Sequence, residues 1–90
     1  MRILSDNEVQ AKKIYDCDAY AAWRSNGPRD DEVTADERLV LSGVRADRGQ
    51  IRPGQRYRRV RFNDGHGIEV WRARLDMDGL CQKYDLYDDA

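Results

Sequence analysis

The feature that most constrains this chain of 90 residues is a β-hairpin signal in its second half. Residues 56–62 and 67–75 are both rich in β-branched and aromatic side chains, as strands usually are. Between them, Asn63-Asp64-Gly65-His66 has the composition of a tight connection, in which Gly65 supplies the positive φ that such turns need. The pattern predicts an antiparallel hairpin at about residues 56–75 as the centre of a small sheet.

The first strand of this hairpin departs from strict alternation. Tyr57 would point away from Val60 and Phe62 if the strand were regular, because successive side chains lie on opposite faces. A β-bulge at Arg58-Arg59 would bring all three apolar side chains to one inward face. We therefore expect a bulged strand with most of its arginines outward.

The first quarter of the chain has helical spacing. Ser5 and Glu8 fit a capping box, in which each side chain bonds the backbone N–H of the other residue. Apolar residues then recur on one helical stripe at Ile14, Cys17 and Ala21. The Asn26-Gly27-Pro28 sequence is a strong stop signal. The pattern predicts a helix at about residues 6–24.

The middle and the end of the chain are less sharply marked. Residues 26–33 are expected to form an exposed acidic connector. Thr34 and Glu37 fit a second capping box, but the apolar residues that follow suit a helix or a strand equally, so the structure of residues 34–44 stays open. Residues 50–75 carry the hairpin with the turn before it, and residues 76–90 form a short C-terminal segment with a last helical turn or two.

The resulting prediction is an α+β fold in a single domain at residues 1–90, with the N-terminal helix packed on the small antiparallel sheet. Charged residues make up 37 % of the chain and hydrophobic residues 40 %, so the core must be small, which also makes a homodimer reasonable. No apolar run approaches the roughly 18 residues of a membrane span, and none follows Met1 as in a secretory signal. We therefore expect a cytoplasmic protein without a membrane partner, with Cys17 and Cys81 as free buried thiols.

Charge is strongly segregated along the chain, although the net charge is only −1. Residues 45–74 contain nine arginines against three acids, whereas both flanking segments are acidic. Arginine suits phosphate and base edges as well as protein hot spots, and Tyr57 and Trp71 could stack on bases. The same arginines could instead pair with the chain's own acids. The candidate partner-binding residues are Arg56, Arg58, Arg59, Arg61, Trp71, Arg72 and Arg74, and an acidic patch is expected at Asp30, Asp31, Glu32, Asp36 and Glu37.

The segment 44–81 resembles a family of small phage and bacterial zinc-knuckle proteins. Their pattern has a Cys-x-x-Cys knuckle, an Ile-x-x-Gly-x-x-Tyr turn, a hairpin with a tryptophan and a closing His-x-x-Cys. This chain matches the scaffold at Ile51, Gly54, Tyr57, Arg58 and Trp71. Cys81 alone stands at a ligand position; Val44, Asp47 and Asp78 occupy the other three. Structural zinc needs four ligands, mostly Cys or His, so we expect neither a metal nor any other cofactor.

No residue set for catalysis is recognised. His66 is the only histidine, and it falls at the predicted hairpin tip, where a solvated side chain is expected. The sequence therefore favours a non-enzymatic binding protein, encoded by a phage or mobile element, that docks on a host protein or ribonucleoprotein complex and inhibits or modulates it. An anti-CRISPR type of anti-defence inhibitor is the most concrete version. The alternative is a nucleic-acid-binding regulator that uses the arginine-rich hairpin.

Overall fold

The computed structural model describes residues 2–87 and has an α+β architecture, which confirms the predicted fold class. Its strands are β1 (Arg2–Gln10), β2 (Tyr15–Asp16), β3 (Gln50–Ile51), β4 (Arg56–Asn63) and β5 (Ile68–Arg74). Its helices are α1 (Asp18–Asn26), α2 (Ala35–Ala46) and α3 (Leu75–Lys83), with a single 3₁₀ turn, η1 (Asp30–Glu32), between α1 and α2. Within the described range, no helix combines the length and the apolar character needed to cross a membrane.

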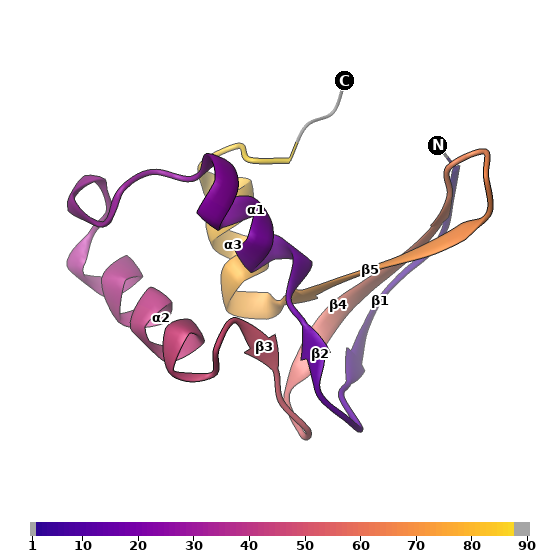
Figure 1. Ribbon diagram of the computed structural model, residues 1–90, viewed down its shortest axis with the longest axis horizontal. Coiled ribbons are helices and arrows are strands. Elements are labelled where there is room, and N and C mark those ends of the chain that lie inside the picture. The colour runs from indigo at the N-terminus through magenta and orange to yellow at the C-terminus, as the bar shows by residue number, and fades with distance from the viewer. Residues whose placement is uncertain (1, 88–90) are drawn as a thin grey trace.

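The main sheet is antiparallel and has the order β1-β4-β5. Figure 1 shows these three strands as a long twisted arm that extends away from the three helices. A second sheet consists only of the short pair β2 and β3. The predicted hairpin is confirmed as β4 and β5, and Gly65 in its connection has a φ of +95°.

The bulge predicted at Arg58-Arg59 is wrong. Pairing between β4 and β5 runs without interruption, and the irregularity in the sheet lies in β1, between Ile3 and Ser5. A bulge is not needed to bury the apolar side chains of β4, because each face of the sheet covers one of them. Tyr57 packs on one face, where its ring centroid lies 5.7 Å from that of Tyr15, and Val60 is covered on the other.

The helix predicted at residues 6–24 is also wrong in its first half. Residues 2–10 form β1, and the helix begins only at Asp18. Ser5 therefore caps no helix, and Ile14 of the expected apolar stripe is 49 % exposed. The physical reason is tertiary: β1 supplies the ladder partner of β4 and carries Asp6, whose carboxylate accepts hydrogen bonds of 2.8 and 2.7 Å from Arg58. Long-range pairing of this kind overrides a local helical pattern.

Residues 35–46 are helical, which settles the question that the sequence left open. Thr34 Oγ1 accepts a hydrogen bond from the Glu37 N–H at 3.1 Å, and Glu37 Oε1 accepts one from the Thr34 N–H at 2.8 Å. This is the predicted capping box. The helix then buries Leu41 and Val44 completely.

The C-terminal segment is more regular than expected, because α3 follows β5 directly. In place of the helical turn or two expected within residues 76–90, a regular helix already begins at Leu75. Glu37 ties this helix to α2, since its carboxylate accepts hydrogen bonds from the Lys83 ammonium and the Tyr84 hydroxyl. The bond from Lys83, and to a smaller extent the bond from Tyr84, lowers the pKa of Glu37 to about 2. The core between the helices and the sheet contains Ala19, Trp23, Leu41, Val44, Ile51, Tyr57, Ala73, Met77, Leu80 and Cys81.

Candidate functional site

The main sheet has two faces of very different composition. Residues directly opposite each other in an antiparallel ladder share a face, and successive residues of a strand alternate between faces. One face, here called the arginine face, takes Arg59 and Arg61 from β4, with Arg72 opposite Arg59. Its full set is Arg2, Ser5, Asn7, Val9, Tyr57, Arg59, Arg61, Asn63, Ile68, Val70, Arg72 and Arg74. None of these residues is acidic.

The other face, here called the mixed face, carries all the acids of the paired strand positions. These acids are Asp6 and Glu8 from β1 and Glu69 from β5. Arg56 and Arg58 share this face with them. The sheet therefore separates charge more sharply than the linear sequence does, because the acids of β1 and β5 fall on the side away from most arginines.

Two arginines of the predicted site are neutralised within the molecule. Arg58, on the mixed face, pairs with Asp6 at 2.7 Å and with Asp78 at 3.1 Å. Its guanidinium lowers the pKa of Asp6. Arg74 pairs with Asp47 at 2.7 Å and with Asp76 at 3.1 Å. Both arginines serve as structural ties between the sheet and the helical part of the chain.

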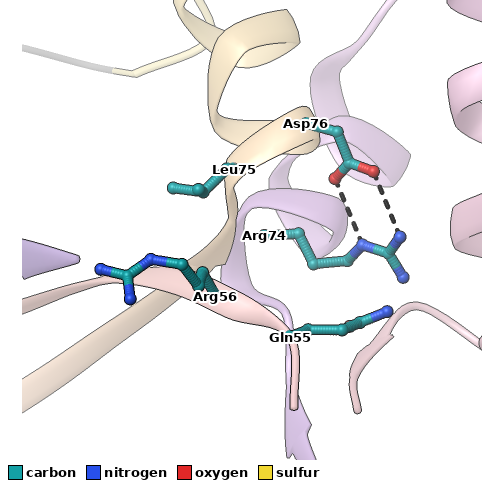
Figure 2. A pocket seen from close by; sticks show the side chains of 5 residues that line it. All are labelled: Gln55, Arg56, Arg74, Leu75 and Asp76. Atoms are coloured by element: carbon teal, nitrogen blue, oxygen red, sulfur yellow. Dashed lines mark hydrogen bonds and ion pairs between the residues drawn. The ribbon is translucent and has the colours of Figure 1, made fainter. Parts of the chain in front are cut away.

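Arg56 and Arg74 come from neighbouring strands, and their side chains point in opposite directions (Figure 2). The two forked hydrogen bonds of Arg74 run to the Asp76 carboxylate, whereas Arg56 extends to the opposite side. Arg56 is exposed on the mixed face and therefore does not belong to the arginine face.

Three arginines of the predicted site remain together on the arginine face. Among residues 2–87, the guanidinium groups of Arg59, Arg61 and Arg72 have no carboxylate oxygen within 4.0 Å. The backbone at Arg72 is fixed by its N–H bond to Asp18 at 2.9 Å, and its guanidinium carbon lies 4.2 Å from the ring centroid of Tyr15. Lys13 contributes a further cation, 5.5 Å from the same ring.

Unpartnered polar atoms gather on this same face. In the part of the chain that the structure describes, three buried side-chain nitrogen or oxygen atoms lack a hydrogen-bond partner: Ser5 Oγ, Arg59 Nε and Arg72 Nε. All three belong to the arginine face. An unsatisfied buried donor costs about 1–3 kcal/mol, and native proteins contain few of them. These unsatisfied groups therefore lie on the same face as the arginines that have no ion-pair partner.

The aromatic residues that were expected to stack on bases lie elsewhere. Tyr57 is only 3 % exposed and belongs to the core. Trp71 lies on the mixed face, with its ring 5.1 Å from Tyr87 in an edge-on arrangement. There it borders a hollow of about 250 Å³ lined by Ile3, Arg58, Val60, Phe62, Trp71 and Tyr87. Trp71 therefore belongs with an apolar surface, whereas the free arginines belong to the arginine face.

The predicted acidic patch is divided by the fold. Asp30 is tied to Arg45 by two hydrogen bonds of 2.8 Å, and Glu37 is buried between α2 and α3. Asp31, Glu32 and Asp36 are exposed. The surface part of the patch is therefore smaller than the sequence indicated.

The positions that carry zinc ligands in the zinc-knuckle pattern have other contacts here. Val44 and Cys81 are fully buried in the apolar core, and burial raises the pKa of the Cys81 thiol to about 11. Asp47 is held by Arg74, and Asp78 by Arg58. Within residues 2–87, no group of three or more His, Cys, Asp or Glu side chains has a metal-binding arrangement. His66 is exposed at the hairpin tip.

Comparisons of the chain with protein-family models, with curated proteins and with solved structures find no match. The site must therefore be interpreted from its own chemistry.

Sequence reasoning did not find the contributions of β1 and β2 to the arginine face. The sequence pattern predicts Ser5 as a helix cap and places Asn7 and Tyr15 within the helix, so it does not predict their position beside the arginines. One signal was present: Asp6 and Glu8 alternate with Ser5 and Asn7, which is the period of a strand with one acidic face.

Proposed function

We propose that this chain is a small non-enzymatic nucleic-acid-binding protein whose contact surface is the arginine face. The observation that carries the proposal is the grouping of Arg59, Arg61 and Arg72, without an ion-pair partner among the described residues, on a sheet face that has no acid. Guanidinium groups pair bidentately with phosphate, and a dense row of them matches a polyanion.

The contacts expected of this surface are with the phosphate backbone. Tyr57 is buried and Trp71 lies on the mixed face, so neither supports base stacking from the arginine face. Tyr15 already lies beneath Arg72 and near Lys13. Backbone contacts position a protein on nucleic acid without reading its sequence. We therefore expect binding that depends on salt and depends little on sequence.

The test is fluorescence anisotropy with labelled 20-nucleotide single strands and duplexes of DNA and RNA. If three arginines each contact one phosphate, log Kobs falls with log salt with a slope of about −2 for single strands and about −2.7 for duplex DNA. Between 50 and 200 mM salt, this slope corresponds to a loss of affinity of roughly 20–40-fold. Replacing Arg59, Arg61 and Arg72 by Gln should abolish binding.

A matched control removes the same charge elsewhere. Arg24, Arg48 and Arg56 are exposed and lie outside the arginine face, so their replacement by Gln should leave most of the affinity intact. Equal losses of affinity in the two triple variants would show that binding depends on net charge alone, which would contradict a contact surface on the arginine face. Absence of binding to all four nucleic acids at 50 mM salt would reject the proposal.

A second candidate function rests on the apolar hollow of the mixed face. Trp, Tyr, Phe and Arg together are the composition of protein-binding hot spots. In this version the chain is a phage-encoded protein that docks on a host protein complex and inhibits it, in the manner of an anti-CRISPR protein. A partner co-purified from a bacterial host should then be lost with Phe62→Asp and retained with Arg59→Gln. The reverse pattern would assign the partner to the arginine face.

A further inference from the structure

The arginine face contains one position where two arginines lie directly opposite each other on neighbouring strands. Arg59 of β4 lies directly opposite Arg72 of β5, and Asn7 of β1 lies opposite Arg59 on the other side. Like charges directly opposite each other destabilise a sheet. Opposite-charge pairs are found elsewhere in this molecule, so the arrangement does not result from a shortage of acids.

Both arginines of this pair also have a buried Nε without a hydrogen-bond partner. An anion seated between the two guanidinium groups would remove the repulsion and accept hydrogen bonds from both side chains. Phosphate fits this role best, because its oxygens accept hydrogen bonds from several planar forks at once and its negative charge offsets the repulsion between the two arginines.

We propose that Arg59 and Arg72, bordered by Asn7, form a phosphate-binding site. The site rests on the proposed function in one respect: its natural occupant is assigned as a phosphodiester of a bound nucleic acid. Arg61, one rung away beside Ser5, would contact the adjoining part of the same backbone. The stacking of Arg72 on Tyr15 holds one side of the site in place before the phosphate arrives.

The test uses inorganic phosphate and thermal unfolding of the full chain. Sodium phosphate is titrated to 20 mM at constant ionic strength with sodium chloride, which separates binding from general salt effects. At a phosphate concentration ten times Kd, linkage predicts a rise in Tm of about 5–10 °C for a domain of this size. The rise should saturate, and it should disappear in Arg59→Gln and in Arg72→Gln.

Arg56→Gln is the control variant, because Arg56 is exposed on the mixed face of the same strand. It should keep the full response to phosphate. Without phosphate, Arg59→Gln should melt no lower than the wild type, since it removes one of two arginines that lie opposite each other and an unsatisfied donor. The same melts report whether each variant folds.

The outcomes separate this site from the proposed function. A phosphate response that is lost in Arg59→Gln, with no nucleic-acid binding by any form, would keep the site and reject the function. Nucleic-acid binding that needs the three arginines, with a phosphate response identical in every variant, would keep the function and reject the site. No phosphate response in the wild type would also reject the site.

Discussion

Arg58 is held by two carboxylates that differ mainly in burial, and this difference makes a quantitative prediction. The side chain of Asp78 is 11 % exposed, whereas that of Asp6 is 42 % exposed. Asp78 also accepts hydrogen bonds from the Tyr87 hydroxyl at 2.7 Å and from Gln82 at 2.8 Å. We expect Asp78→Ala to destabilise the protein far more than Asp6→Ala.

The magnitude follows from the partners that each substitution leaves behind. Removing one member of a buried charge pair costs about 3–5 kcal/mol. Arg58 keeps Asp6 and some access to water after Asp78→Ala, so a loss of about 2–3 kcal/mol is expected. Asp6→Ala removes a surface pair and should cost at most about 1 kcal/mol. In a domain of this size, these losses lower Tm by roughly 10–20 °C and by at most about 8 °C, respectively.

Urea unfolding followed by tryptophan fluorescence and by circular dichroism gives both free energies. Trp71 is a suitable reporter because its ring packs against Tyr87. Tyr87→Phe provides an internal control: alone it should cost about 1 kcal/mol, and in the Asp78→Ala background almost nothing, because the bond is already lost. Equal losses for Asp6→Ala and Asp78→Ala would refute the reasoning, since burial would then not decide the strength of the pair.

Three further predictions concern the helices and the buried thiols. Thr34→Ala should cost about 1 kcal/mol in urea unfolding through loss of the cap, whereas Ser5→Ala, at the other predicted capping box, should be nearly neutral because Ser5 lies in a strand. Glu37 has a pKa lowered to about 2, so its contribution to stability is complete above its unfolded pKa of about 4.3 and is lost as the pH falls toward 2. Glu37→Gln should therefore reduce the fall in Tm between pH 5 and pH 2. An unchanged slope of Tm against pH would contradict this. Cys17 and Cys81 are buried with raised thiol pKa values, so a thiol reagent at pH 8 should react much more slowly with the folded protein than in urea, and fast labelling without urea would argue against their burial.

Local sequence patterns predicted the elements that are formed by residues close together in the chain. The Asn63-Asp64-Gly65-His66 connection and its flanking strands predicted the β4–β5 hairpin, and the reciprocal hydrogen bonds of Thr34 and Glu37 start α2 where the sequence placed a cap. Each needs only residues a few positions apart. The choice of helix for residues 35–46 was not decided locally, because the same apolar residues fit a strand until burial of Leu41 and Val44 selects one face.

Other features depended on partners far away in the chain. Residues 2–10 have a weak helical signal, and their role as β1 follows from pairing with β4 some 50 positions later. The expected bulge failed for a similar reason, since the core takes Tyr57 on one face while Trp71 and Tyr87 border Val60 on the other. Contacts between distant residues leave little trace in local periodicity.

The sequence by itself determined that this chain has a hairpin dense in arginine, acidic flanks and a small core. Whether the arginines were already neutralised could only be decided by tertiary structure, because ion pairing depends on which strand faces which. The fold pairs Arg58 and Arg74 with the chain's own acids and leaves Arg59, Arg61 and Arg72 together on a face without acids. Alternation along β1 and β5 produces this result, since a strand sends successive side chains to opposite faces and the acids fall on the other one.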